Sequence, residues 1–231
     1  MLGIIGAMNT EVETLISALT DRKETVLAGS HFFSGKLGCT DAVVVMCGIG
    51  KVAAAICAQA MIDTFHPDAL INTGVAGGVA DGLAQGDLVI ATDAVQHDFD
   101  ISLFGHAKGY MPVWGKDHLQ PSPFPMDEAL AVKLITSAED LGYHAVRGRI
   151  ASGDIFVADP ALKQTLSTDF AASAAEMEGA AIAQTAWQNN IPCAIVRAIS
   201  DLADGSATLS FEEFEAIAAE RSANLLLEIC K

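Results

Sequence analysis

The chain has 231 residues, of which 51% are hydrophobic and 18% charged, enough apolar material for one large core or two small ones. Its 29 Asp and Glu residues outnumber 13 Lys and Arg residues, giving a net charge of -16. Such a negative field repels phosphate backbones and anionic lipids, so we expect no nucleic acid partner and no membrane partner. The chain has no charge-free apolar run of about 18 residues, so it predicts no membrane span.

Cysteine usage indicates a reducing compartment. The five cysteines are an odd number, widely spaced and without a C-x-x-C pair: Cys39, Cys47, Cys57, Cys193 and Cys230. This pattern predicts buried free thiols, with no disulfide framework and no zinc site. Because residues 1–6 also lack the basic start and long apolar stretch of a signal peptide, we expect a cytoplasmic protein. We expect no cofactor and no metal, since the one candidate metal cluster, residues 97–100, has no second cluster to complete it.

Short apolar runs alternate with amphipathic helical stretches along the chain. Strands are predicted at 2–6, 41–47, 69–73, 87–95, 146–152 and 193–200, and helices at 10–20, 51–65, 126–141, 177–190 and 211–229. Several of the strand runs are apolar on both faces, as in strands covered by helices on each side. The alternation predicts one α/β domain over residues 1–231, built around a mostly parallel or mixed sheet.

The segment 96–125 differs from the rest. Four prolines within it, at 112, 121, 123 and 125, interrupt regular structure, and aromatic residues including Trp114 lie among them. A loop of this length inside a compact domain is usually functional or covered by a partner.

Acidic residues follow three of the strands, where open α/β sheets bind their ligands. Thr10 and Glu13 have capping-box spacing, which leaves Glu11 without a structural role. A carboxylate favoured by the helix dipole is the alternative interpretation of Glu11.

Two further acidic groups come later in the chain. Glu176 and Glu178 precede an alanine-rich stretch, and they are predicted to lie at the start of a helix. They either interact favourably with the helix dipole there or belong to a functional site. Asp201 ends a buried strand, where it is either a site residue or a helix cap. Because side chains alternate along a strand, Asp201 is expected on the same face as Arg197. A buried arginine needs an acidic partner, and Glu11 is a possible one.

Two glycine-rich turns also follow strands, at residues 48–51 and 74–78. Neither has the spacing of a P-loop or a dinucleotide-binding turn. Their glycines permit a ligand to approach the backbone closely.

Together these segments resemble the methylthioadenosine/S-adenosylhomocysteine nucleosidase family of the nucleoside phosphorylase superfamily. The matching segments run in the family's order along nearly the whole chain: 3–8 with 11–12, 48–54, 71–74, 76–78, 152–154, 176–178, 197–201 and 209–211. Glu-Met-Glu alone would be a weak signal, but its combination with the later Ser-Asp and the early Gly-Ala-Met is specific.

The resemblance implies a three-layer α/β/α sandwich with a mixed, partly barrel-like central sheet. It also implies a homodimer in which loop 97–112 of one subunit reaches the other's site, contributing Ile101, Phe104 and Pro112 from the partner subunit. The implied reaction is hydrolysis of the N-glycosidic bond of methylthioadenosine and S-adenosylhomocysteine.

By the same resemblance, Glu11 is the general base that activates water, Asp201 the acid at the adenine leaving group, and Glu178 the ligand of the ribose hydroxyls. The family's remaining substrate contacts map onto Met8, Ile49, Ala76, Gly77, Phe156, Val157, Glu176, Met177, Arg197, Ser200 and Phe211. These roles fit the charges that develop on the sugar and on the departing purine.

The chain departs from the family at Val75, where members often carry serine in the glycine-rich turn. A phosphorylase is the nearest rival function, but only Lys51 and Arg197 are candidate phosphate ligands. Two more hypotheses stay open, because fold alone does not assign function. They are hydrolysis of aminofutalosine or futalosine, and a non-catalytic nucleoside-binding module.

Overall fold

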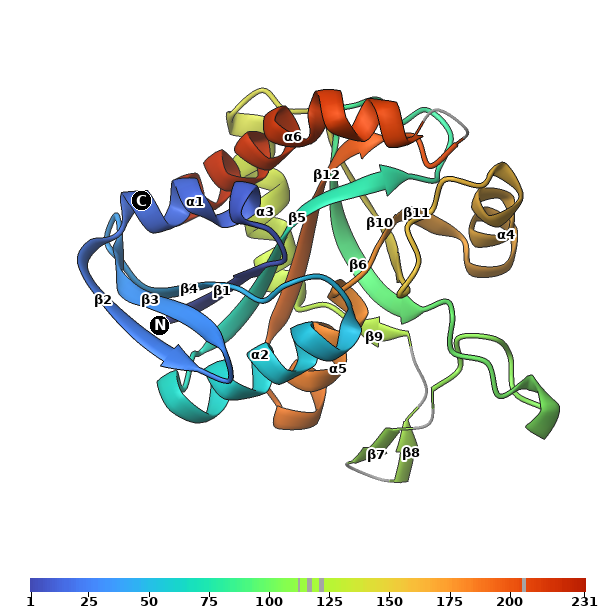
Figure 1. The fold of residues 1–231 in the computed structure, drawn as a ribbon, viewed down its shortest axis with the longest axis horizontal. Coiled ribbons are helices and arrows are strands. Elements are labelled where there is room, and N and C mark those ends of the chain that lie inside the picture. Colours follow the sequence, from blue (N-terminus) through green and yellow to red (C-terminus); the bar gives the residue numbers. More distant parts are fainter. Residues whose placement is uncertain (112, 116–117, 121–122, 205–206) are drawn as a thin grey trace.

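A ten-stranded mixed sheet organises the chain (Figure 1). The structure, a computed structural model, describes residues 1–111, 113–115, 118–120, 123–204 and 207–231. The strands of the sheet are β1 (Leu2–Gly6), β2 (Thr20–Leu27), β3 (Ser30–Leu37), β4 (Thr40–Met46), β5 (Ala69–Gly78), β6 (Leu88–Gln96), β9 (Phe124–Pro125), β10 (Ala145–Ser152), β11 (Ala172–Glu176) and β12 (Cys193–Asp201). A separate pair, β7 (Val113–Gly115) and β8 (His118–Gln120), stands apart from it.

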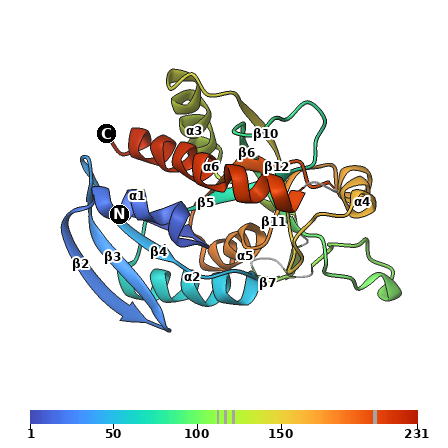
Figure 2. The same cartoon turned by 45° about the horizontal axis from the view of Figure 1, so that its top comes forward.

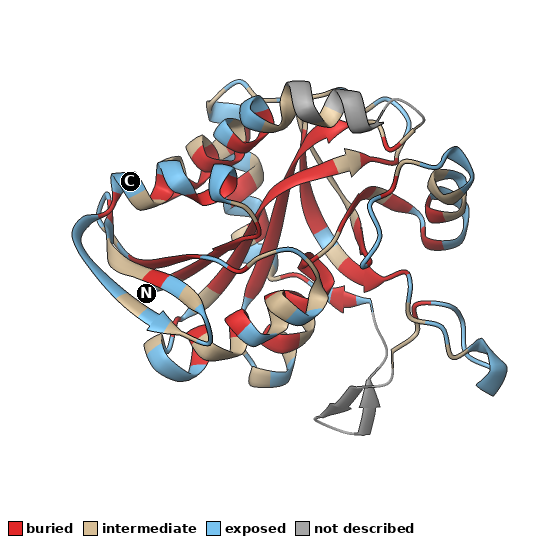
Figure 3. Cartoon of the chain, in the orientation of Figure 1, coloured by how far each residue is buried: buried red, intermediate tan, exposed pale blue. Residues whose placement is uncertain are grey.

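The helices are α1 (Asn9–Ala18), α2 (Lys51–Phe65), α3 (Glu128–Asp140), α4 (Pro160–Phe170), α5 (Gly179–Asn189) and α6 (Ala207–Ile229), with a short 3-10 turn at Ser102–Phe104. Helices α2 and α5 lie on one face of the sheet, and α1, α3 and α6 lie on the other (Figures 1 and 2). Each face has its own hydrophobic cluster, so most of the central strands are buried (Figure 3).

Half of the sheet closes on itself. The strand order is β11-β10-β6-β12-β5-β1-β4-β3-β2, and β11 also pairs with β5. Strands β5, β12, β6, β10 and β11 therefore form a closed barrel, from which β1, β4, β3 and β2 extend as an open sheet. Both parallel and antiparallel pairs occur, for example β12 with β5 and β12 with β6. The predicted three-layer α/β/α architecture with a partly barrel-like sheet is confirmed.

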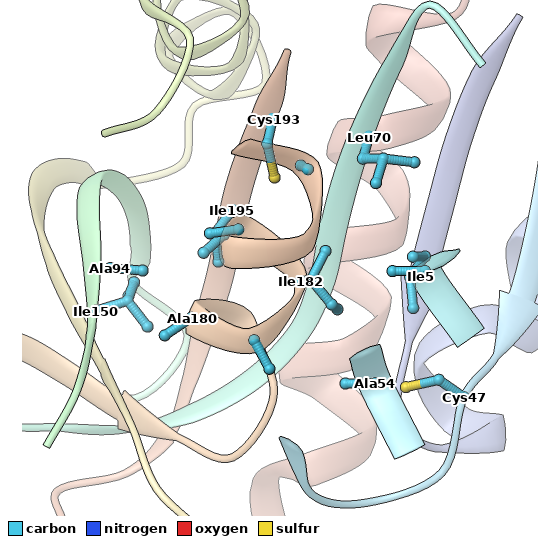
Figure 4. Close-up of a cluster of buried hydrophobic side chains, with 14 of the residues drawn as sticks. Ile5, Cys47, Ala54, Leu70, Ala94, Ile150, Ala180, Ile182, Cys193 and Ile195 are labelled. Atoms are coloured by element: carbon cyan, nitrogen blue, oxygen red, sulfur yellow. The ribbon is translucent and has the colours of Figure 1, made fainter. Parts of the chain in front are cut away.

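The packing under α2 and α5 shows why the strands are apolar in sequence. In Figure 4, Ile182 of α5 lies between Ile195 of β12 and Leu70 of β5, and Ala54 of α2 lies beside Cys47. All of these side chains belong to one buried cluster. Small residues on the helices allow the helices to approach the sheet closely.

All six predicted strands and all five predicted helices are present, with ends shifted by a few residues. The sequence patterns did not indicate the β2–β3 hairpin, α4 or β11. Residues of β2 are mostly exposed and charged, which hides the alternation of an edge strand. The expectation that Glu176 and Glu178 both stand at the start of a helix holds only for Glu178, which immediately precedes α5 at Gly179; Glu176 ends strand β11. Strand β11 consists mostly of alanines and carries no β-branched residue, so propensity favoured a helix.

Among the helices of the described residues, none has the length and apolarity needed to cross a bilayer.

Candidate active site

A cavity of about 110 Å³ opens where β1, β5, β11 and β12 end. It is lined by Ala7, Met8, Glu11, Ile49, Val75, Ala76, Gly77, Phe156, Ala175, Glu176, Met177, Glu178, Ser200, Asp201 and Phe211. A smaller recess continues from it and shares Gly77, Phe156 and Asp201 with the main cavity, adding Ile155 and Val157.

The structure brings most of the sequence-predicted site residues to this cavity. Arg197 does not line it but lies buried behind it, and Val157 lines the adjoining recess. Ile101 and Phe104 do not line either space within the single chain. Pro112 lies outside the described residues.

Glu11 is held by backbone N–H groups at the start of α1. Its Oε2 accepts from the amides of Ala7 (2.6 Å) and Met8 (3.0 Å), and its Oε1 accepts from the amide of Val75 (3.0 Å). Burial raises the pKa of the Glu11 carboxyl, against the lowering effects of Arg197 and these three amides. Position 75 therefore contributes to the binding of Glu11 through its backbone amide, which valine and serine both supply.

The capping box expected at Thr10 and Glu13 is wrong. The N-cap of helix α1 is Met8, two residues before Thr10, so Glu11 itself is the residue that reaches back to the first amides. The Thr10 hydroxyl instead donates to Glu215 of α6, and Glu13 accepts from the Asn9 side chain. The spacing rule failed because the expected cap lay two residues after the observed one.

Arg197 is almost fully buried, and its guanidinium donates to Glu176 and to the Asn72 side chain, not to the expected Glu11. Glu178 lies 3.7 Å from the same guanidinium, and Glu11 acts on it only through its charge. A Cβ at Gly74, which has a φ of 154°, would collide with both Glu11 and Arg197. Glycine at position 74 therefore leaves room for the carboxylate of Glu11 and the guanidinium of Arg197 to lie close together.

Glu176 is the structural member of the Glu-Met-Glu segment. One of its oxygens accepts from the Ser152 hydroxyl, and the other accepts from the amides of Glu178 (3.1 Å) and Gly179 (2.8 Å) as well as from Arg197. With both oxygens engaged by the protein, Glu176 anchors the start of α5 although it borders the cavity.

Glu178 is freer and faces the cavity. Its Oε1 accepts from the amide of Gly50 (2.9 Å), the residue just before α2. Burial, reinforced by the negative charge of Glu176, raises its pKa to about 7, against the attraction of Arg197. The carboxyl can therefore bind a proton or a donor near neutral pH.

Asp201 ends β12 after an irregularity in the strand. The register with β5 shifts between Ile199 and Asp201, so the simple alternation expected from Arg197 to Asp201 is interrupted at Ser200. Asp201 Oδ1 accepts from the amide of Ala203 (2.8 Å), and Oδ2 accepts from the Ser200 hydroxyl (2.9 Å). Burial raises the pKa of Asp201, which favours the protonated acid.

Two aromatic rings border the opening of the cavity. Phe156 and Phe211 meet edge to face, with ring centroids 5.7 Å apart and an interplanar angle of 84°. Phe156 remains about half exposed, which leaves its ring available for stacking.

The sequence did not indicate the backbone donors of the site, Gly50 and Val75, or the network that holds Lys51. The Lys51 ammonium lies 2.5 Å from Asp98, and the Lys51 amide donates to Asp154 (2.9 Å). The glycine-rich turns were the available signal, but the partners of a backbone amide depend on folding. Among the described residues, no group of three or more His, Cys, Asp or Glu side chains is arranged to hold a metal ion.

Comparison with known proteins identifies the family of the chain. The model of the phosphorylase superfamily matches residues 1–231. The chain belongs to the phosphorylase superfamily. Within the superfamily it is 44% identical, over 99% of this chain and 97% of the relative, to the 5'-methylthioadenosine/S-adenosylhomocysteine nucleosidase of Haemophilus influenzae (strain PittEE). The family resemblance found in the sequence is confirmed.

Solved superfamily structures agree as well. The 5'-methylthioadenosine/S-adenosylhomocysteine nucleosidase of Neisseria meningitidis, in complex with methylthio-immucillin-A, is 38% identical with a TM-score of 0.93, covering 99% of this chain and 97% of that one. A futalosine hydrolase of Helicobacter pylori is 34% identical with a TM-score of 0.91, covering 99% and 96%. The fold is therefore shared by enzymes named for different nucleosides.

Proposed function

We propose that this chain hydrolyses the N-glycosidic bond of 5'-methylthioadenosine and S-adenosylhomocysteine, releasing adenine. The observation that carries the proposal is the pair Glu11 and Asp201 in one largely apolar cavity. Asp201 also lines the smaller recess, whereas Glu11 does not, so the two carboxyl groups serve different parts of a bound nucleoside.

Each carboxyl group suits one step of the reaction. Asp201, with its pKa raised by burial, would donate a proton to the departing base in the recess beside Phe156. Glu11, fixed by three amides, would accept a proton from water, and Glu178 would bind the ribose hydroxyls. The division of labour is that of an inverting glycosidase, with one carboxyl for the leaving group and one for water.

A phosphorolytic reaction would need free cationic groups beside the sugar. The two candidates are engaged: Lys51 pairs with Asp98, and Arg197 is buried against Glu176. Water is therefore the better-supported nucleophile, although the fold is that of the phosphorylase superfamily.

A substrate panel tests the proposal. Adenine release would be measured from methylthioadenosine, S-adenosylhomocysteine, adenosine, adenosine monophosphate and aminofutalosine, with and without phosphate. Met8, Ile49 and Phe211 offer the 5' end of the substrate apolar surface, which favours methylthioadenosine over adenosine by about 10–200-fold in kcat/KM. Adenosine monophosphate should be inert, because its phosphate would be buried without a partner.

Two results of this panel would change the assignment. A kcat/KM for aminofutalosine well above that for both thioether nucleosides would favour the hydrolase named in the Helicobacter relative. A strict requirement for phosphate would indicate a phosphorylase.

The catalytic roles are tested by Glu11→Gln and Asp201→Asn, which keep the shape of each side chain. Each substitution should lower kcat at least about a hundredfold, the scale of acid–base catalysis, without unfolding the protein. Near-native turnover by either variant would show that its carboxyl group is not the acid or base.

A further inference from the structure

Three charged side chains at the start of α2 have no role in the proposed reaction, yet they form one connected network. Lys51 is the first residue of α2, Asp98 follows β6, and Asp154 follows β10. The Lys51 ammonium lies 2.5 Å from Asp98 and 3.9 Å from Asp154, and the Lys51 and Asp98 side chains are only 16% and 19% exposed. Because water and salt screen a covered ion pair less than a surface pair, this network can hold its segments in place.

Asp154 is held from two sides. Its backbone amide donates to Oδ2 of Asp98 (2.9 Å), and its own Oδ1 accepts from the amide of Lys51 (2.9 Å). The turn that carries Asp154 is also fixed to the end of β11, because the Gly153 amide donates to the carbonyl of Glu176 (3.0 Å). Although burial alone would raise it, hydrogen bonds from the Lys51 side chain and the Asp154 amide lower the pKa of Asp98, so this carboxyl is ionised at neutral pH.

The same helix start reaches the active-site cavity through Gly50. Gly50 is the N-cap of α2 and has a φ of 98°, a conformation that favours glycine. Its amide donates to Oε1 of Glu178 (2.9 Å), and the next amide, that of Lys51, donates to Asp154. Two carboxylates distant in sequence therefore cap two consecutive amides of α2, at the end where the helix dipole favours negative charge.

We propose that Asp154 is a positioning residue for Glu178: it fixes the start of α2 so that the Gly50 amide meets the Glu178 carboxylate, while Lys51 and Asp98 hold Asp154 in place. The inference rests on the proposed function, in which Glu178 binds the ribose hydroxyls. Asp154 is not among the residues that line the cavity or its recess. It therefore acts on the substrate only through the Gly50 amide and Glu178.

The Gly50 hydrogen bond matters because the surroundings of Glu178 are mostly acidic. Burial and the charge of Glu176 raise its pKa to about 7, Arg197 and the Gly50 amide lower it, and Glu11 raises it again. The nearby Cys47 thiol stays neutral, since burial raises its pKa. Loss of the Gly50 hydrogen bond should therefore raise the pKa of Glu178 further. At neutral pH the ribose hydroxyls would then meet a protonated carboxyl in place of an ionised acceptor.

The pH dependence of kcat/KM for methylthioadenosine tests this role. Asp154→Ala removes the acceptor of the Lys51 amide and should lower kcat/KM about tenfold near neutral pH, the scale of one hydrogen bond to a charged group. Its acidic limb should move to higher pH, because activity is lost as Glu178 binds a proton and the pKa of Glu178 is higher in the variant. Asp154→Asn keeps an oxygen that can accept from the same amide. This variant should stay within about threefold of the wild type, with its acidic limb restored.

Lys51→Met is an independent variant. Methionine is a good helix former and keeps the backbone amide at position 51, but it removes the ammonium that holds Asp98 and Asp154. The acidic limb should move in the same direction as in Asp154→Ala, by a smaller amount.

A matched control lies at the start of another helix. Asp127 accepts from the amide of Leu130 (2.9 Å) at the start of α3, on the opposite face of the sheet from α2. Asp127→Ala therefore removes the same kind of hydrogen bond and should leave the acidic limb unchanged.

The outcomes separate the positioning role from the reaction. A wild-type protein that releases no adenine from methylthioadenosine overturns the proposed function and the positioning role with it. An active wild type with an unmoved acidic limb in Asp154→Ala overturns the positioning role alone, even if turnover falls equally at every pH. An Asp154→Asn variant as impaired as Asp154→Ala also overturns it, because the acceptor oxygen would then not be what matters. If Asp154→Ala does not fold in thermal unfolding measurements, the limb of Lys51→Met decides by the same criterion.

Discussion

Burial raises the pKa of three of the carboxyl groups that line the cavity, those of Glu11, Glu178 and Asp201. A raised pKa means that the folded protein binds the proton more tightly than the unfolded chain does. The site therefore favours protonated forms at a cost to the stability of the ionised protein at neutral pH. Backbone amides and Arg197 limit that cost for Glu11.

For Asp201 this cost depends on pH in a direction that can be measured. Its stabilising contribution is fully present below the unfolded pKa of about 3.9 and is lost as the pH rises through the raised folded pKa. The asparagine of the Asp201→Asn variant cannot ionise, and its amide oxygen can still accept from the amide of Ala203. The melting temperature of this variant minus that of the wild type should therefore increase from about pH 4 to about pH 8 in thermal unfolding. A difference that stays constant or shrinks with pH would contradict the raised pKa.

At the scale of elements, α4 contacts both sides of the smaller recess, which would hold the adenine base: the Phe156–Val157 segment and the turn after Asp201. It follows the Phe156–Val157 segment, and its Lys163 ammonium donates to the carbonyl of Leu202 (2.7 Å), in the turn after Asp201. Val157 and Ala203 belong to the same buried cluster as Leu166 of α4. Helix α4 thus supports the ring of Phe156 and the carboxyl of Asp201 together.

Lys163 is accordingly expected to be a positioning residue for Asp201. Lys163→Met should lower kcat about fivefold to tenfold, through loss of one charged hydrogen bond, and Lys163→Arg should restore part of it. The Lys163 charge lowers the pKa of Asp201, opposing the larger effect of burial, so its removal should shift the alkaline limb of the kcat/KM profile to higher pH. If the alkaline limb of the kcat/KM profile does not move in Lys163→Met, Lys163 has only a structural role.

At the scale of the whole molecule, apolar side chains remain uncovered on the segment after β6. Leu103 is 98% exposed and Phe104 is 81% exposed, in the 3-10 turn that projects from the body of the fold (Figures 1 and 3). Ile49, which lines the cavity, and Val52, at the start of α2, are exposed as well. Both a projecting apolar loop and an apolar receiving surface are therefore present.

We therefore expect a homodimer in which Ile101 and Phe104 of one subunit cover the cavity of the other. Light scattering at micromolar concentration should give twice the chain mass. Phe104→Asp should shift the protein toward monomer and lower kcat/KM for methylthioadenosine, whereas Ile217→Asp, at an exposed position on α6, should do neither. A fully active wild-type monomer would refute the dimer and the shared site.

The alternation of apolar runs and amphipathic stretches was enough to predict the α/β architecture, because burial on both faces of a strand dictates its composition. The same pattern of apolar runs did not predict strands β2 and β11. Charged β2 lies on the sheet edge, and β11 is a strand because its backbone pairs with β10 and β5, not because its alanines prefer that conformation.

The residue patterns drew attention to the acids after strand ends, where such sheets place chemistry, and the family resemblance assigned their roles; the structure brings these acids to one cavity. Their partners were not readable from the chain. Whether Arg197 pairs with Glu176 or Glu11, and whether Glu11 or Glu13 reaches back to the first amides of α1, depends on small differences in where a helix starts and how side chains are placed. Contacts between residues distant in sequence, such as Glu178 with Gly50, arise only when the barrel closes. Closure is a property of the pairing between strands, which no local pattern records.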